Sequence, residues 1–216
     1  MTTQITDDFV KATIELGGLL MKFSQVKRAT YVDKSGISES DTDHTTMLAI
    51  MACAIASKIE PGLDIGKVAQ YALVHDLVEV YAGDVNTINF HTIDHKAKEQ
   101  NEAKALLRIT QEFGEVFPWI HTMIEAYEKL DDPESRFIKT LDKVMPAITH
   151  VHTDNIAVNE GFDDPVAFEG SVLARNEDMK KTFAHDQKNV MQLREVILKE
   201  IVDKKYKHHG IKRISK

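Results

Sequence analysis

The chain has 216 residues, a formal net charge of −7, 43% hydrophobic residues and 28% charged residues. This length suits one domain with a sizeable core, and the negative charge gives no general attraction to nucleic acid or to membrane surfaces. A single cysteine, Cys53, excludes an intramolecular disulfide, and its apolar neighbours place it in the core. The sequence MTTQITDDFV has no signal-peptide pattern and no apolar run is long enough to span a bilayer, so we expect a cytoplasmic protein.

Apolar residues recur with helical spacing in the first third of the chain, and no period-two strand is apparent. The first predicted helix covers 6–27. The second covers 43–58, with Asp43 as its N-cap. The third begins after Asp64 and continues to about Tyr81, where Gly83 is expected to end it.

A polar loop is predicted over 84–92, followed by a highly charged helix over 93–113. Further helices are expected over 116–130, with Pro118 in the first turn, and from Pro133 to about 152. A loop rich in Gly and Asp over 155–170 and one or two helices over 172–204 complete the chain. The pattern predicts one all-α domain of seven or eight helices, with a core at about 6–155 and C-terminal helices and a basic tail over 156–216.

The stretch YALVHDLVEVYAGD places acidic residues and a histidine in an apolar helical segment. Buried charges are costly unless they are paired or bound to a metal. At about 100° per residue, His75 and Glu79 share one helix face, and Asp76 lies one step round it. Imidazole and carboxylate are common ligands of divalent transition metals. We predict that His44, at the start of another helix, and Asp142, in an apolar segment, complete the site.

Each of these residues also has a purely structural interpretation. His75 and Asp76 are compatible with a buried histidine and its carboxylate partner, and Glu79 with a surface acid. Asp84 follows Gly83, which is common turn chemistry. Arg28 is compatible with a solvated cation at a helix end.

Four motifs in order resemble the HD-domain metal-dependent phosphohydrolases, in the branch of the bacterial 5'-deoxynucleotidases and their eukaryotic relatives. HDLVEVYAGD resembles the signature of that branch, and KRATYV before ESDTDH resembles the segment that joins its first helices. ESRFIKTLDKV, with YEKL just upstream, resembles the helix of the last ligand. The resemblance covers about 9–155. It implies an HD-domain helical bundle and a homodimer.

The resemblance also implies roles for individual residues. One divalent ion (Mn²⁺, Co²⁺, Fe²⁺, Zn²⁺ or Mg²⁺) would be held by His44, His75, Asp76 and Asp142, with Glu79 and Asp84 as catalytic acids. A metal with open coordination positions acts as a Lewis acid and lowers the pKa of bound water. Because guanidinium matches phosphate, Arg28 is the candidate for binding the substrate phosphate. Tyr31 is the candidate for contacting the sugar. It does not directly follow Arg28, because Ala29 and Thr30 lie between them.

The predicted function is therefore metal-dependent removal of phosphate from (deoxy)nucleoside 5'-monophosphates. One alternative is a dNTP triphosphohydrolase, which needs extra cations for the outer phosphates; Lys22, Lys27 and Lys34 lie near Arg28 in sequence. Another alternative is a regulator that binds a nucleotide without hydrolysing it. Such a regulator has no need of the two acids Glu79 and Asp84, so they favour an enzyme.

Overall fold

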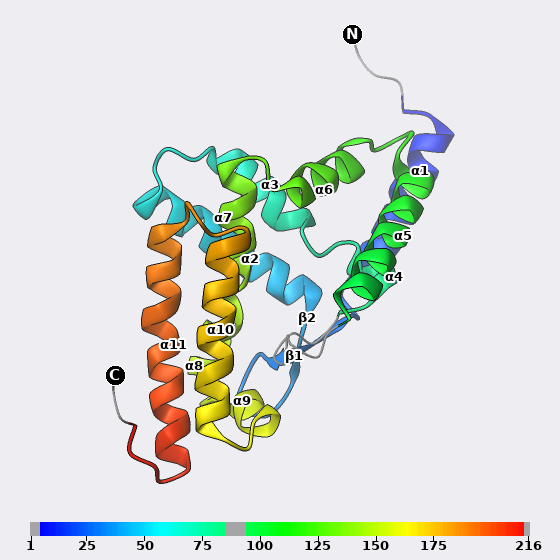
Figure 1. Cartoon of the computed structure of the whole chain (residues 1–216). Coiled ribbons are helices and arrows are strands. Elements are labelled where there is room, and N and C mark those ends of the chain that lie inside the picture. The colour runs from blue at the N-terminus through cyan, green and yellow to red at the C-terminus, as the bar shows by residue number, and fades with distance from the viewer. Residues whose placement is uncertain (1–4, 85–93, 214–216) are drawn as a thin grey trace.

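The computed structural model describes residues 5–84 and 94–213, and it shows a helical bundle with one small β-hairpin (Figure 1). The prediction of an all-α fold is confirmed. In chain order the elements are α1 Asp7–Phe23, β1 Lys27–Tyr31, β2 Ser38–Ser40, α2 Asp41–Ile59, α3 Ile65–Val74, α4 Glu79–Ala82, α5 His95–Phe113, α6 Trp119–Lys129, α7 Pro133–Asp142, α8 Met145–His152, α9 Ile156–Gly161, α10 Pro165–Thr182 and α11 Lys188–His208.

Two groups of helices flank a central layer in Figure 1. The long helices α10 and α11 lie side by side at one end of the molecule, and α1, α4 and α5 lie at the other. Between them, α2 packs on α3, and α3 packs on both α6 and α7. The central layer therefore brings together helices that are far apart in the sequence.

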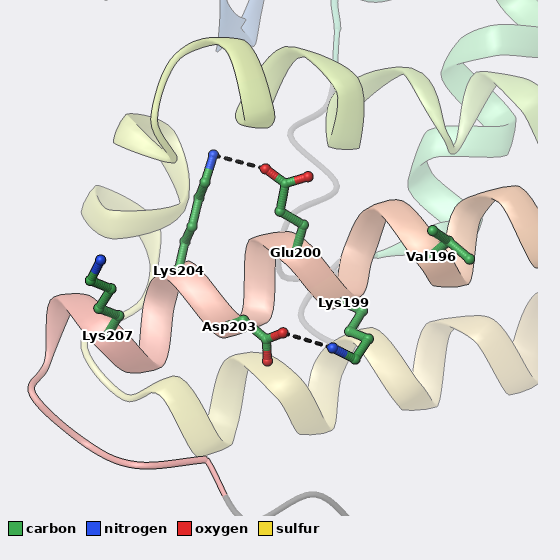
Figure 2. A pocket seen from close by; sticks show the side chains of 6 residues that line it. All are labelled: Val196, Lys199, Glu200, Asp203, Lys204 and Lys207. Atoms are coloured by element: carbon green, nitrogen blue, oxygen red, sulfur yellow. Dashed lines mark hydrogen bonds and ion pairs between the residues drawn. The ribbon is translucent and has the colours of Figure 1, made fainter.

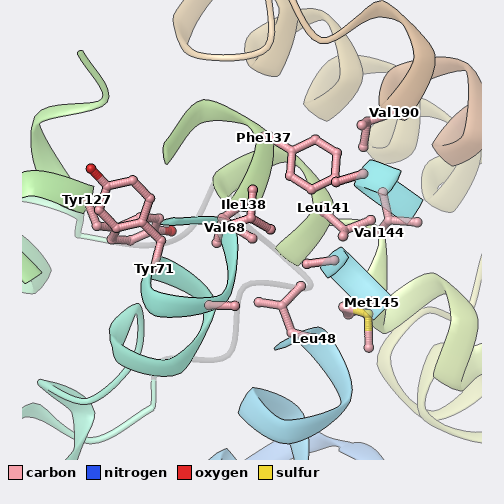
Figure 3. Close-up of a cluster of buried hydrophobic side chains, with 13 residues drawn as sticks. Leu48, Val68, Tyr71, Tyr127, Phe137, Ile138, Leu141, Val144, Met145 and Val190 are labelled. Atoms are coloured by element: carbon pink, nitrogen blue, oxygen red, sulfur yellow. The ribbon is translucent and has the colours of Figure 1, made fainter. Parts of the chain in front are cut away.

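The main core cluster joins these central helices (Figure 3). Leu48 of α2, Val68 of α3 and Phe137 and Leu141 of α7 are fully buried there. Burying one large apolar side chain contributes roughly 1.5–3 kcal/mol. This packing fixes α2, α3 and α7 relative to one another, and each of them carries or adjoins a predicted metal ligand.

The β-hairpin corrects the prediction that the first helix extends to residue 27. Helix α1 ends at Phe23, and β1 pairs antiparallel with β2, with Lys27 opposite Ser40 and Tyr31 opposite Ser38. Gly36, at φ 82°, lies in the connecting turn, where its backbone takes a conformation that favours glycine. The strands escaped prediction because they are short and include few apolar residues, so they show little alternation.

Helix α2 begins at Asp41, earlier than predicted. The N-cap is Ser40 rather than Asp43: its hydroxyl accepts a hydrogen bond from the Asp43 N–H, and the Asp43 carboxylate accepts one from the Ser40 N–H. This capping box satisfies two otherwise unpaired N–H groups at the start of the helix. Asp43 therefore stands at the third position of the helix, where it completes the cap.

The third predicted helix is interrupted. Helix α3 ends at Val74, and hydrogen bonds from Leu77 N–H to the Val74 carbonyl and from Glu79 N–H to the Asp76 carbonyl form tight turns before α4. The Ala72 carbonyl, inside the last turn of α3, accepts a hydrogen bond from the His75 ring at 2.8 Å. The prediction that His75 and Glu79 share one face of a single helix is therefore wrong. His75 is the C-cap of α3, and Glu79 begins α4.

Two further boundaries differ in the C-terminal half. The helix predicted from Pro133 to 152 is divided into α7 and α8, because Pro146 has no N–H to bond to the carbonyl four residues earlier. The loop predicted over 155–170 contains α9 and the first turns of α10, which Asp164 caps through its carboxylate. These changes give more helical segments than the seven or eight predicted.

Asp64, by contrast, caps α3 and Gly83 ends α4, as predicted. Helix α6 begins at Trp119, with Pro118 in the N-cap position.

Cys53, expected in the core, is only partly buried. Within the residues that the structure describes, no helix is both long enough and apolar enough to cross a bilayer. Apart from Asp84, the predicted loop over 84–92 lies outside the described residues.

Candidate metal centre

The structure brings His44, His75, Asp76 and Asp142 to one place. His44 lies in the first turn of α2, His75 is the C-cap of α3, Asp76 follows it, and Asp142 is the last residue of α7. One ligand atom from each of them lies within 4.8 Å of all the others. The helix ends thus supply a four-residue group whose members come from three separate parts of the chain.

The distances within this group suit a single cation. Asp142 Oδ1 lies 3.0 Å from His44 Nε2 and 3.9 Å from His75 Nε2. Asp76 Oδ2 lies 3.0 Å from His75 Nε2 and 3.8 Å from His44 Nε2. Ligand atoms about 2.1 Å from an octahedral ion are separated by about 3.0 Å when adjacent and about 4.2 Å when opposite. The four side chains therefore fit one divalent ion.

The histidine rings present the nitrogen that a metal needs. Nδ1 of His75 donates to the Ala72 carbonyl, which leaves Nε2 as the lone-pair nitrogen; this buried Nε2 faces Asp76 Oδ2 at 3.0 Å. On the other ring, Nδ1 of His44 lies 3.8 Å from Oε1 of Glu39. Metal-bound histidines commonly direct their second nitrogen to a carbonyl or a carboxylate in this way. The lone pair of His75 Nε2 faces a carboxylate oxygen of Asp76, and this favours a metal over a closed structural network, because the two repel unless a cation lies between them.

The charges around the cluster favour a cation. Burial alone raises the pKa of Asp142, but Lys143, His44 and His75 hold it well below its usual value. Burial lowers the pKa of His44, but the neighbouring carboxylates of Asp142 and Glu39 outweigh it and raise the pKa to about 9. The second oxygen of Asp142 lies 2.7 Å from Lys143 Nζ, so the first oxygen is the one that remains for a metal.

Glu79 and Asp84 line a cavity of about 500 Å³ that opens beside this cluster. Glu79 is buried, and its Oε2 has no hydrogen-bond partner. Burial first, and then the charges of Asp76, Asp84 and Asp41, raise the pKa of Glu79 to about 11. Burial also raises the pKa of Asp84. A bound cation would oppose these shifts. Both acids therefore lie at the wall of the cavity, next to the four-residue group.

The two predicted substrate-binding residues have different surroundings. Arg28 lines the cavity, and its Nη1 contacts Asp76 Oδ2 at 2.8 Å. Tyr31 is not among the residues that line this cavity, and its hydroxyl donates to Glu160 of α9 at 2.7 Å. The structure therefore brings Arg28 to the cluster and places the hydroxyl of Tyr31 against α9.

The cations around the cavity are not those suggested by sequence proximity. Lys34 forms an ion pair with Asp154, and neither Lys22 nor Lys27 lines the cavity. Apart from Arg28, the cationic residues that line it come from distant helices: Lys98, Lys139, Lys143 and Arg175. Lys139 and Lys143 lie within the quoted segment ESRFIKTLDKV. No local sequence signal marks Lys98 or Arg175, because only the packing of α5 and α10 brings them to the cavity.

Glu39 and Asp41 are the residues beside the ligands that sequence reasoning missed. Their side chains are almost fully buried. Both belong to the segment ESDTDH, so their position within a quoted motif was a signal, although only His44 was selected from it. Glu39 lies 3.8 Å from the ring of His44 and Asp41 lies 3.2 Å from Arg28, which indicates a supporting role for both acids.

A second hollow lies on the surface of α11 (Figure 2). Lys199 pairs with Asp203 at 3.0 Å and Lys204 pairs with Glu200 at 3.0 Å. These pairs largely neutralise the charges of the hollow. Arg213, in the basic C-terminal tail, forms ion pairs with Asp203 and with Glu169 of α10. We therefore assign no ligand to this surface.

Comparison with known proteins agrees with this geometry. A family model described as HD domain matches residues 21–195. This chain belongs to the HD domain family. The group that could hold a metal comprises a histidine, a His-Asp pair and a distant aspartate. The sequence resemblance to HD-domain phosphohydrolases is thus confirmed for most of the chain.

Similar curated proteins include the human 5'-deoxynucleotidase HDDC2, which is 31% identical over 106 residues that cover 49% of this HD-domain chain and 50% of the human protein. The Dictyostelium discoideum protein of the same name is 32% identical over 129 residues, which cover 56% of this chain and 67% of that protein. The chain thus spans about half the length of the mammalian relatives that it matches.

Among solved structures, a predicted metal-dependent phosphohydrolase from Magnetospirillum magnetotacticum MS-1 is similar, with a TM-score of 0.71 and 22% identity. The match covers 93% of this HD-domain chain and 98% of that one. A conserved hypothetical protein from Pyrococcus furiosus matches with a TM-score of 0.54, 24% identity, and coverage of 87% and 98%. At these identities the likeness establishes the fold.

Proposed function

We propose that this protein is a phosphohydrolase that uses one divalent metal ion to remove the phosphate from deoxynucleoside 5'-monophosphates. The observation that carries the proposal is the four-residue group beside a cavity of about 500 Å³ that Glu79 and Asp84 line. The name 5'-deoxynucleotidase of the relatives supports the choice of substrate.

Three residues of the chain have separate roles in the proposed hydrolysis. When bound, the metal supplies Lewis acidity at the phosphate and at the attacking water. Arg28 stabilises negative charge on the phosphate oxygens, because guanidinium forms charge-assisted hydrogen bonds with them. Glu79, whose pKa is raised, donates a proton to the leaving 5'-oxygen as its bond to phosphorus breaks. Asp84 orients the water that forms the new bond to phosphorus and accepts a hydrogen bond from it.

The charge of the cavity favours a monophosphate over a triphosphate. Acidic side chains outnumber cationic ones among the lining residues. The cations are also close to acids: Lys98 Nζ lies 2.6 Å from Glu102, and Lys143 Nζ lies 2.7 Å from Asp142. A triphosphate would bring more negative charge into this cavity than a monophosphate does. We therefore keep the dNTP triphosphohydrolase as the less favoured alternative.

The test is phosphate release from a panel of dNMPs, NMPs and dNTPs with added Mn²⁺ or Co²⁺. We expect inorganic phosphate from dNMPs and little turnover of dNTPs. Consumption of dNTPs alone would support the triphosphohydrolase. Nucleotide binding without any phosphate release would support the non-catalytic regulator.

Other features of the proposal come from the sequence and stay predictions. These are the contact of Tyr31 with the sugar, the homodimer, the cytoplasmic location and the identity of the metal. The ratio of dNMP to NMP turnover in Tyr31→Ala, measured in the same panel, tests the first of them. A ratio equal to that of the wild type would remove Tyr31 from the substrate site.

A further inference from the structure

A second group of acids adjoins the predicted metal centre. Carboxylate oxygens of Asp41, Asp76 and Glu79 lie within 4.8 Å of one another, and Asp76 belongs to both groups. Asp41 is fully buried, and its Oδ2 has no hydrogen-bond partner; the same is true of Oε2 of the buried Glu79. Buried carboxylates at this spacing repel one another unless a cation or a proton lies among them. The arrangement resembles the ligand set of a second divalent ion beside the first.

In this protein a side chain supplies the cation. Nη1 of Arg28 lies 2.8 Å from Asp76 Oδ2, 3.2 Å from Asp41 Oδ1 and 3.8 Å from Glu79 Oε2. The Arg28 side chain is only 13% exposed, so these contacts are poorly screened by solvent. One guanidinium nitrogen thus contacts all three members of the acidic group.

The hairpin explains how Arg28 reaches this position. Strand β1 carries Arg28, and the neighbouring strand β2 carries Glu39, whose Oε2 lies 3.8 Å from Arg28 Nε. Asp41 opens α2 directly after β2. Glu39 of the hairpin thus lies near Nε of Arg28, while the acidic group contacts Nη1.

We propose that the Arg28 guanidinium occupies the place of a second divalent ion, so that the acidic group formed by Asp41, Asp76 and Glu79 stays metal-free and the protein binds one metal per chain. A permanently charged group at this place gives the active site a second positive centre that does not depend on metal supply. The inference rests on the metal centre of the proposed function, and it concerns the number of ions rather than the substrate.

Metal counting tests this inference without any activity measurement. The protein is stripped with chelator, dialysed to equilibrium against excess Mn²⁺, and its bound metal is measured by mass spectrometry. We expect one Mn²⁺ per chain in the wild type and two in Arg28→Ala, because the vacated group then takes an ion. In Arg28→Lys, where a cationic side chain is retained, we expect one.

The double variant Arg28→Ala/Asp41→Asn identifies the second site. Asp41 belongs to the acidic group and not to the first ligand group, so its neutralisation should return the count from two to one. One ion in a folded Arg28→Ala protein, or two ions in the double variant, would overturn the inference.

The Mn²⁺ electron paramagnetic resonance spectrum of the wild type provides a test that requires no variant to fold. An isolated six-line signal is expected at saturating metal, and the signal of an exchange-coupled pair would contradict the inference. Absence of any bound metal in the wild type would remove the metal centre itself, and with it the proposed function. That outcome is distinct from a wild type with one ion whose count does not rise in Arg28→Ala.

Discussion

Oε1 of Glu39 lies 3.8 Å from Nδ1 of His44, while Nε2 of the same ring faces Asp142 at 3.0 Å. The ring is therefore placed between a supporting carboxylate and the predicted metal position. Oε1 of Glu39 is buried and has no hydrogen-bond partner. We expect it to draw close to the His44 N–H when a metal is bound, and so to fix the orientation of the ring.

Glu39→Gln should therefore weaken metal binding by about tenfold to a hundredfold, the range measured for such supporting groups. Calorimetric titration of the chelator-stripped protein with Mn²⁺ measures the affinity. Glu195→Gln, on an exposed part of α11, is the matched control and should leave the affinity unchanged. An unchanged affinity in Glu39→Gln would show that Glu39 does not support metal binding through His44.

Replacing Glu79 and replacing Asp76 should have different effects. Glu79→Ala should keep its metal and lose most of its turnover, by about a hundredfold to ten-thousandfold, because it removes the proton donor. Asp76→Ala should lose the metal, because it removes a ligand. Phosphate release from a dNMP and metal content are measured on the same samples, with Glu125→Ala on the exposed face of α6 as the control. Wild-type turnover in Glu79→Ala would refute its assigned role.

The backbone at Gly83 should be important for placing Asp84. Gly83 has φ 77° and ψ 150°, a conformation that only glycine adopts readily. Gly83→Ala should cost about 1–3 kcal/mol of unfolding free energy and lower turnover by moving Asp84. Urea denaturation and dNMP hydrolysis measure the two effects. Gly62→Ala, at a glycine without a positive φ, should change neither; equal effects at the two positions would contradict the argument.

His150 should make stability depend on pH. Burial lowers the pKa of His150 from 6.5 to about 4, and Glu39 opposes this only in part. Because the folded pKa is depressed, the unfolded chain takes up the proton first. Stability should be complete above pH 6.5 and fall by up to about 3 kcal/mol as the pH drops to 4.

Urea denaturation between pH 4 and pH 7 measures this dependence. In His150→Gln the loss of stability over that interval should be smaller than in the wild type. His152 is exposed and lies two residues further along α8, so His152→Gln should retain the wild-type dependence on pH. The same slope in all three proteins would mean that His150 does not carry the effect.

Asp132 should stabilise the start of α7 through its charge. Burial raises the pKa of Asp132, but hydrogen bonds with Lys67, the Ser135 N–H and Tyr71 outweigh it and lower the pKa to about 2. The depressed pKa means that this stabilisation is present above pH 4 and disappears as the pH falls through 2. Asp132→Asn keeps the shape of the cap and should cost about 2 kcal/mol at pH 7.

The unfolding free energies of Asp132→Asn and wild type should converge near pH 2, as measured by urea denaturation at pH 7 and at lower pH. Asp131→Asn is the control, because Asp131 is exposed. A difference that persists unchanged at pH 2 would assign the effect to the geometry of the cap rather than to its charge.

Much of this protein can be predicted from the sequence alone. Helical periodicity predicts the all-α fold because each helix must bury one apolar face, and a face of that kind repeats in the sequence. The signals at Asp64 and Gly83 are local, so they predict the helix boundaries at those positions. The sequence also selects the four side chains that the structure brings together, because chemistry restricts candidate metal ligands to few residue types: His44, His75, Asp76 and Asp142.

The tertiary structure alone decides what surrounds those residues. The break after Val74, the hairpin that carries Arg28 and the approach of α10 to the cavity depend on contacts between distant segments, which no short stretch of sequence encodes. The same is true of the electrostatics: whether Arg28 faces solvent or three buried carboxylates changes its role, and only packing determines this. Residue types specified the chemistry available at the site, and long-range packing specified which charges meet there.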